Sequence, residues 1–311
     1  MKNRTLRANF FLLLTAAIWG LAFVAQRIGA QYIGAFAFNG VRFALGSLSL
    51  VPLLFYSAKK SKTEAQHNSA RIMAAGTTAG TVLFIASSLQ QIGLAETSAG
   101  KAAFITGLYM VIVPLLGVFL KQCIPVFTWI GVAIATIGLY FLSVAEVFTI
   151  VRADLLELIG AFFWALHILL IDRFIKNMDL LKLSFFQFLT CSILSLTVAF
   201  FTENITLSSI QRAAIPILYG GILSVGVAYT LQAAGQKYAK PSHAAIILSL
   251  EAVFASLGGF LVLQENLGFK GYLGCFLMLT GMLISQFQNF RKNLSPQHII
   301  QKHHNHEPDN Q

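Results

Sequence analysis

The sequence predicts an all-α integral membrane protein with ten transmembrane helices, arranged as two inverted five-helix repeats. Three observations predict this fold class: few charged residues, apolar runs long enough to cross a bilayer, and internal matches at a nearly constant spacing. Of the 311 residues, 56% are hydrophobic and only 11% are charged, which is too little charge to coat a water-facing surface. Lipid offers no partners for backbone N–H and C=O groups, so we expect the apolar runs to be helices.

Ten apolar runs are long enough to span a membrane, and they use most of the chain. We place the spans at residues 9–29, 35–56, 71–92, 100–120, 124–144, 155–175, 181–201, 212–232, 243–263 and 268–288. The first run follows a short basic segment, as in a signal peptide, but it lacks a small-residue cleavage site, so we interpret it as a retained helix. Residues 291–311 are polar and are predicted to form a disordered cytoplasmic tail.

The distribution of Lys and Arg predicts the orientation. With a cytoplasmic N-terminus, the basic residues that fall on the outer side are Arg27, Lys101, Arg152, Arg212 and Lys270. Arg42 lies within a span, and all the other Lys and Arg residues fall on the inner side. This bias predicts a multi-pass protein of the cell inner (plasma) membrane with both termini in the cytoplasm. The same bias accounts for the formal net charge of +10, so we do not expect a nucleic-acid partner.

Weak matches between the two halves of the chain occur in the same order. They are Leu89-Gln90 with Leu231-Gln232, Ala102-Ala103-x-Ile105 with Ala244-Ala245-x-Ile247, Gly131-x6-Gly138 with Gly274-x6-Gly281, and Trp19-x-Leu21 with Trp164-x-Leu166. We therefore expect one repeat at 9–144 and a second at 154–288. Each repeat holds five helices, an odd number, so the second repeat must enter the membrane from the opposite side. Inverted repeats are typical of alternating-access transporters, whose substrate sites lie near the midplane.

Several short motifs carry a resemblance to a known family. They are Ala16-Ala17-Ile18-Trp19-Gly20, Asn39-Gly40-Val41-Arg42-Phe43, Ala102-Ala103-Phe104-Ile105 before Pro114, Leu248-Ser249-Leu250-Glu251-Ala252-Val253-Phe254, and Gln264-Glu265 before Gly271 and Gly274. In their order and spacing, the chain resembles the EamA-domain transporters of the drug/metabolite transporter superfamily over nearly its whole length. The resemblance implies two inverted five-helix repeats around a central cavity, and export or exchange of small metabolites such as amino acids or their analogues.

The chain departs from the family pattern at two places. It has Glu251-Ala252 where the family often has Glu-Pro, and Lys121-Gln122 where the fourth helix often ends in Gly-Glu. The first departure bears on how the helix bends near the expected site.

Glu251 is the most informative single residue, because it lies near the middle of the ninth span. A charged side chain at that depth costs at least a few kcal/mol unless it faces water or a partner. We predict that it binds a substrate amine or carries a proton. The alternative is a structural carboxyl group bonded to a neighbouring helix.

Other polar or aromatic residues at mid-span are further candidates for the cavity. His167 could titrate near neutral pH or form a neutral structural hydrogen bond, and the sequence does not show whether it meets Glu251. The remaining candidates are Trp19 and Trp164, Gln90 and Gln232, Asn39, Arg42, Thr106, Tyr109, Tyr229 and Ser249. Helix packing is the alternative role for the tryptophans. For Arg42 the alternative is a place at the outer rim or a pair with Glu265.

The motifs of other function classes are missing from the sequence. It contains no Walker A motif, no H-E-x-x-H and no G-x-S-x-G, so we expect neither an enzyme nor an ATP-driven pump, and no cofactor. Four histidines in the tail have no thiolate partner, so we expect no metal site.

The expected partners are a small-molecule substrate and the lipid bilayer. Protons are a candidate coupling ion, and a homodimer is a candidate assembly. The rival functions are a carrier of nucleotide-sugar or lipid-linked substrates, a membrane-embedded enzyme and an assembly partner.

Overall fold

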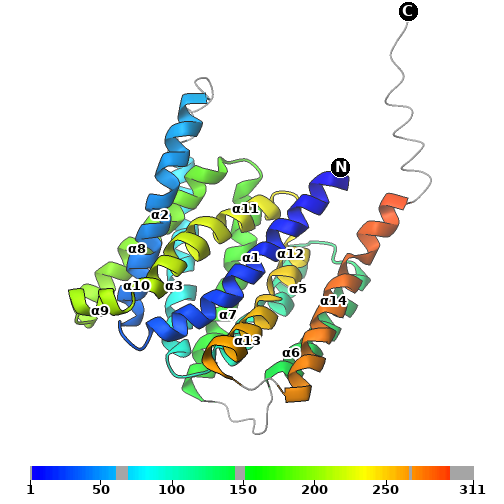
Figure 1. Cartoon of the computed structure of the whole chain (residues 1–311). Coiled ribbons are helices and arrows are strands. Elements are labelled where there is room, and N and C mark those ends of the chain that lie inside the picture. Colours follow the sequence, from blue (N-terminus) through cyan, green and yellow to red (C-terminus); the bar gives the residue numbers. More distant parts are fainter. Residues whose placement is uncertain (1, 61–68, 144–150, 266–267, 295–311) are drawn as a thin grey trace, which may run out of the picture.

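The computed structural model describes residues 2–60, 69–143, 151–265 and 268–294, and the regular elements within these ranges are helices (Figure 1). The elements are α1 (Lys2–Gly29), α2 (Ala35–Lys60), α3 (Ser69–Leu94), α4 (Ala99–Gly107), α5 (Tyr109–Phe119), α6 (Val126–Ser143), α7 (Arg152–Ile175), α8 (Leu180–Thr202), α9 (Leu207–Arg212), α10 (Ala214–Leu218), the π-helix η1 (Tyr219–Tyr229), α11 (Thr230–Gln236), α12 (Pro241–Leu248), α13 (Glu251–Leu263) and α14 (Gly268–Leu294). The short helix α9 lies between two predicted spans. The predicted tail, 291–311, begins with the last residues of α14, and its remainder lies outside the described residues.

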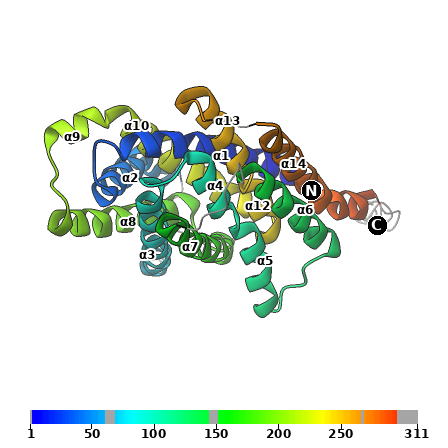
Figure 2. The ribbon, with the colours of Figure 1, turned by 90° about the horizontal axis from the view of Figure 1, so that it is seen from below.

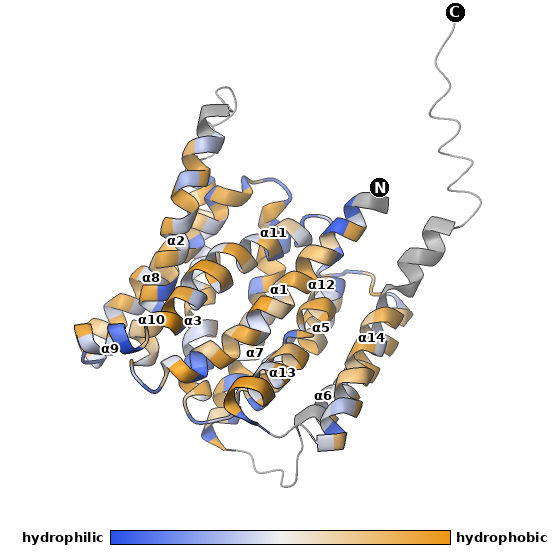
Figure 3. Ribbon diagram, in the orientation of Figure 1, coloured by the Kyte–Doolittle hydropathy of each residue, from blue (hydrophilic) through white to orange (hydrophobic). Residues whose placement is uncertain are grey.

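Within the described part of the chain, nine helical stretches are long and apolar enough to cross a bilayer. The segment predicted at 124–144 forms α6, whose described apolar part, Val126–Gly138, is shorter than such a span. Figure 3 shows apolar residues along the helices and hydrophilic residues mainly near their ends. Large apolar side chains such as Phe200, Ile215 and Phe269 are exposed, which suits a surface in contact with lipid.

Two predicted spans are interrupted rather than continuous. The segment 100–120 divides into α4 and α5 at Leu108, and the segment 243–263 divides into α12 and α13 at Ser249 and Leu250. Leu108 N–H donates to Ile105 O over 3.1 Å, and Leu250 N–H donates to Ile247 O over 3.2 Å. Such i→i+3 bonds tighten the backbone turn at both places. The two leucines are 142 positions apart, which is the offset of the best sequence matches.

The span predicted at 212–232 also differs from a plain α-helix. Its central part is the π-helix η1, whose carbonyl groups accept hydrogen bonds from side chains of α1. Trp19 Nε1 donates to Ser224 O over 3.2 Å, and Thr15 Oγ1 donates to Ala228 O over 3.1 Å. Long π-helices are rare, and π-turns occur frequently at functional sites.

Two helix pairs form the edges of the bundle, α6 with α14 and α2 with α8 (Figure 2). Glycines allow the close approach in the first pair: a Cβ atom on Gly131 or on Gly281 would lie 2.5 Å from the carbonyl oxygen of the other. Gly80 of α3 touches α8 in the same way, because its Cβ would lie 2.6 Å from Gln187 O. Small residues at helix contacts suit a bilayer, where lipid tails are as apolar as leucine and backbone proximity supplies the attraction.

Two carboxylates tie helices together at the end of the bundle opposite Lys2 (Figure 1). Glu203, directly after α8, accepts hydrogen bonds from the N–H groups of Phe36 and Ala37 over 2.9 and 2.8 Å. Glu265, two residues after the end of α13, accepts from the N–H groups of Ala99 and Gly100 over 3.2 and 3.4 Å. Glu203 therefore caps the start of α2 and Glu265 the start of α4, where unpaired N–H groups favour a negative charge.

Candidate functional site

A cavity lies between the central helices, and most of the residues predicted to form a site line it. Its walls are Trp19, Ala22, Phe23 and Gln26 of α1, Arg42 of α2, Gln90 of α3, Thr106 of α4, Tyr109 of α5, Trp164 and Ile168 of α7, Ser224 and Tyr229 of η1, Gln232 of α11 and Glu251 of α13. The centre of a water-sized sphere can occupy about 20 Å³ between these side chains. That is room for about one water molecule, so a larger molecule fits only if the walls separate.

The two helix breaks place Tyr109 and Glu251 at equivalent positions in the cavity wall. Tyr109 is the first residue of α5, and Glu251 is the first residue of α13. Their numbers differ by 142, as do those of the leucines at the breaks. A helix begins at each of these residues, and N–H groups of its first turn are hydrogen-bonded across the break, as those of Val111 to Leu108 O and of Ala252 to Ser249 O show.

Glu251 supplies a negative or neutral carboxyl group to this cavity. Its side chain is 3% exposed, and neither of the ion pairs found among the described residues involves it. The hydroxyl group of Tyr109 is close enough to interact with it electrostatically.

Arg42 supplies a positive charge to the same cavity. Its side chain is 2% exposed, and its guanidinium group lies over the rings of Phe38 and Phe43, 5.5 and 4.9 Å from the ring centroids. Its Nε donates to Asn39 Oδ1 over 3.0 Å, and the amide nitrogen of Asn39 donates to Ser87 O over 3.0 Å. Arg42 forms no ion pair within the described ranges, so an anion in the cavity would be its first charged partner.

The proposed pairing of Arg42 with Glu265 is wrong. Glu265 accepts backbone N–H groups at the start of α4, whereas Arg42 faces the cavity. The physical reason is that a helix start offers several N–H donors at one point, which satisfies both oxygens of a carboxylate.

The two repeat-related tryptophans meet at the cavity. The ring centroids of Trp19 and Trp164 are 6.3 Å apart, and Tyr229 contacts both rings at 4.6 and 6.1 Å. Trp19 also donates to η1, so it packs helices and lines the cavity at the same time. Tyr229 stacks on Trp164 with an angle of 25° between the ring planes. These rings form an apolar wall beside the charged groups.

Polar atoms in the wall remain available to a ligand. Two of them have no hydrogen-bond partner among the described residues: Gln26 Oε1 and Trp164 Nε1. Buried polar groups are normally hydrogen-bonded, so unpaired ones in a cavity wall indicate places for ligand atoms. The set contains a donor and an acceptor, which suits a small polar molecule.

Gln90 and Thr106 belong to a second polar group that starts in the wall. Gln90 Nε2 donates to Thr106 Oγ1 over 3.3 Å, and Thr106 Oγ1 donates to Glu157 Oε2 over 2.9 Å. Gln232, the repeat-related partner of Gln90, is 1% exposed and lines the same cavity.

Three predicted site residues lie behind the wall rather than in it. Asn39 positions Arg42, and Ser249 lies in the break before α13, where its hydroxyl group donates to Ile246 O over 2.9 Å. His167 is bonded to Gln187 Oε1 over 2.9 Å and contacts the ring of Tyr229. No hydrogen bond or ion pair joins His167 to Glu251 among the residues that the structure describes, so the two do not form a pair.

Sequence reasoning missed Gln26, Ser224 and Glu157. Gln26 precedes Arg27 near the end of an apolar run, a place where polar residues are ordinary. Ser224 contributes its backbone carbonyl, which a side-chain pattern does not reveal. Glu157 lies near the start of its span, where an acidic residue looks like part of a loop.

Comparison with known proteins identifies the group to which this molecule belongs. The model of the EamA-like transporter family matches the chain twice, over residues 6–144 and 151–287. The chain belongs to the EamA-like transporter family. It is therefore a multi-pass membrane transporter, as its resemblance to EamA-domain proteins predicted.

Individual relatives of this EamA-like transporter carry the same general name. An uncharacterized transporter of Archaeoglobus fulgidus is 34% identical over 288 residues, which cover 90% of this chain and 86% of the relative. The uncharacterized transporter YoaV of Bacillus subtilis is 22% identical, with 89% of this chain and 96% of the relative covered. One solved crystal structure superposes with a TM-score of 0.75 at 15% identity and covers 93% of this chain and 99% of the other, so it has the same fold.

Proposed function

We propose that this EamA-like transporter exports or exchanges small zwitterionic metabolites, such as amino acids or their analogues, by alternating access through the central cavity. The observation that carries the proposal is the presence of two buried groups of opposite charge, Glu251 and Arg42, in the wall of one cavity, neither of which has an ion pair among the described residues. Burial has removed the water that would solvate the side chains of Glu251 and Arg42. A substrate amine bound at Glu251 and a substrate carboxylate bound at Arg42 would compensate for that loss. Trp19, Trp164 and Tyr229 would cover the apolar part of such a molecule.

The proposal includes ten membrane-crossing segments in two inverted repeats. The helix contacts support this arrangement, because the main ones have counterparts under exchange of the halves. α3 packs on α8 as η1 packs on α2, and α4 and α5 pack on α7 as α12 and α13 pack on α1. With α6 as the tenth segment, the end that contains Lys2 would face the cytoplasm of an inner membrane, as the basic residues predict. The end capped by Glu203 and Glu265 would then face outward.

The charge of the cavity wall favours this substrate class over nucleotide sugars or lipid-linked molecules. The lining of the cavity holds one cation, Arg42, whereas a diphosphate group would call for several.

The test compares metabolites in the medium of cells that express the wild type, Glu251→Gln, Glu96→Gln or an empty vector, at matched protein abundance. Glu96 is an exposed carboxylate close to the end of α3, so its variant controls for the loss of one charge. We expect amino acids or their analogues to accumulate outside cells with the wild type and Glu96→Gln only. Four equal profiles would contradict export, and accumulation of nucleotide sugars would favour the rival substrate class.

A further inference from the structure

Glu157 of α7 is a buried carboxyl group that the proposed substrate site does not use. Its side chain is 0% exposed, and it lies behind Thr106 rather than in the cavity wall. Its one hydrogen bond is accepted by Oε2 from Thr106 Oγ1 over 2.9 Å, and Oε1 has no partner among the described residues. A carboxylate with one neutral donor at this depth is far from satisfied, because an ionised group needs a cation or several donors when it is buried.

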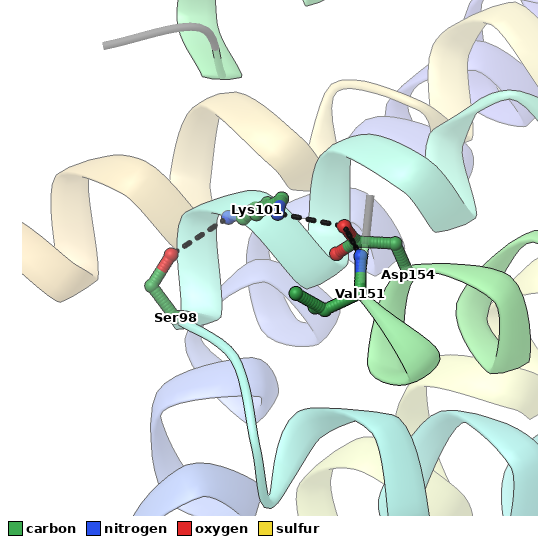
Figure 4. Close-up of polar contacts among 4 residues, drawn as sticks. All are labelled: Ser98, Lys101, Val151 and Asp154. Atoms are coloured by element: carbon green, nitrogen blue, oxygen red, sulfur yellow. Dashed lines mark hydrogen bonds and ion pairs between the residues drawn. The ribbon is translucent and has the colours of Figure 1, made fainter. Parts of the chain in front are cut away.

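The nearby cation is already engaged by another acid. Lys101 Nζ pairs with Asp154 Oδ2 over 2.8 Å, and the same oxygen accepts the N–H group of Val151 over 3.0 Å (Figure 4). Asp154 is one helical turn before Glu157 and is 7% exposed. The carboxylate of Asp154 is thus paired with a cation, whereas the carboxyl group of Glu157, deeper in α7, has no ion pair among the described residues.

Among the described residues, the other helices that pack on α7 offer Glu157 no ion-pair partner. On α4 the charged residue is Lys101, and the titratable groups at the starts of α5 and α13 are Tyr109 and Glu251. α11 contains no titratable residue, and α3 and α12 carry Arg71 and His243 in their first turns, at the opposite end of the bundle (Figure 1). α3 faces Glu157 with Gly93, where a Cβ atom would lie 3.0 Å from Glu157 Oε1.

A chain of hydrogen bonds links Glu157 to the cavity. Gln90 donates to Thr106, and Thr106 donates to Glu157, so both cavity residues are oriented by the carboxyl group behind them. When Glu157 is ionised, the Thr106 hydroxyl group is held as a donor to it. When Glu157 gains a proton, the attraction that fixes this orientation weakens, and the amide of Gln90 is free to turn toward the cavity.

We propose that Glu157 is a proton-binding site, separate from the substrate cavity and coupled to it through Thr106 and Gln90. The proposal rests on the function proposed above, since the proton would be the ion exchanged for the substrate. An O–H bond forms on Glu157 when it is reached by water at the outer face. The same bond breaks when the cavity opens to the cytoplasm, where the proton is released. Inward movement of protons then drives outward movement of substrate.

The first experiment does not depend on any substrate. Purified wild type, Glu157→Gln, Glu251→Gln and Glu96→Gln are compared by infrared spectroscopy between acidic and alkaline pH, with ¹³C-labelled glutamate to assign the protonated carboxyl band. We expect a buried carboxyl band that Glu157→Gln removes and that Glu96→Gln and Glu251→Gln retain. An unchanged spectrum in Glu157→Gln would overturn the proposal.

If Glu157→Gln fails to fold, Thr106→Val replaces it. This variant removes the hydrogen bond to Glu157 and keeps the shape of the side chain. The Glu157 carboxyl band should then move to higher frequency, because a free C=O bond is stiffer than a hydrogen-bonded one. A band that does not move would show that it belongs to another group, and the proposal would fall.

The second experiment measures coupling in proteoliposomes with a mixture of radiolabelled L-amino acids. The wild type should accumulate label when a pH gradient is applied, and Glu157→Gln should lose this accumulation while it retains exchange of labelled for unlabelled amino acids. Accumulation by Glu157→Gln at the wild-type level would refute the coupling role. Absence of all transport by the wild type would contradict the proposed function, and the infrared titration would still decide whether Glu157 binds a proton.

Discussion

Replacement of Glu203 by Gln should loosen the start of α2 by an amount that the structure allows us to work out. The half-buried carboxylate accepts two N–H groups, those of Phe36 and Ala37, over 2.9 and 2.8 Å. A hydrogen bond to a charged group contributes about 1.5 kcal/mol at the low end of its range, which suits partial exposure, so the pair contributes about 3 kcal/mol. Glutamine keeps one neutral bond of about 1 kcal/mol, so the loss is about 2 kcal/mol.

This loss can be measured by hydrogen exchange. Local opening controls the exchange of these two amides, and about 2 kcal/mol corresponds to roughly a thirtyfold faster exchange. The assay is hydrogen–deuterium exchange of a peptide that contains Phe36 and Ala37, read by mass spectrometry in detergent or nanodiscs. Glu96→Gln, which removes an exposed carboxylate, serves as the control and should leave this peptide unchanged. Equal exchange in Glu203→Gln and wild type would refute the idea that the carboxylate holds the helix start.

Three further predictions concern packing and the site. Gly20→Ala should lower the melting temperature by about 5 °C, because the new Cβ atom would lie 2.3 Å from Phe254 Cβ. Gly160→Ala is the control and should leave the melting temperature unchanged, because its Cβ atom would meet ordinary contacts from 3.6 Å. Equal melting temperatures of the two variants would contradict the packing argument. Asn39→Ala should weaken binding of amino acids about tenfold, since the Arg42 guanidinium group loses the acceptor that orients it; unchanged affinity in a thermal-shift titration would refute this. Trp19→Phe removes a hydrogen bond to η1 and should destabilise the protein by about 1 kcal/mol in a denaturation assay, and a stability equal to that of the wild type would argue that the bond is dispensable.

The sequence predicted most of the helical spans because each depends on local composition, and nine helical stretches in the described part of the chain are long and apolar enough to cross a bilayer. The positions of Trp19, Gln90 and their counterparts led us to predict an internal repeat. The candidates named from that predicted repeat, Trp19 and Trp164 with Gln90 and Gln232, lie around one cavity. Whether they bind substrate stays a prediction.

The helix breaks and the hydrogen-bond partners were not predictable in this way. Leu108 and Leu250 are ordinary helix formers, so nothing in composition marks a break at either one. Glu265 was named as a possible partner of Arg42, but it binds the start of α4 instead. That contact joins residues far apart in the chain, so the sequence does not reveal it. His167 was named for its chemistry, but its orientation toward Gln187 follows from helix rotation, which its residue type does not specify.

The interrupted helices have a mechanical consequence. α4 packs on α13 toward one end of the bundle, where Glu265 joins them, and α5 packs on α12 toward the other end. The breaks at Leu108 and Leu250 lie between these two pairs, and we expect them to act as hinges. One pair would then tilt while the other stays in place, so the two ends of the molecule need not deform together. Tyr109 and Glu251, each the first residue beyond a hinge, lie where both movements meet. A bound molecule in contact with them would therefore register the opening of either end.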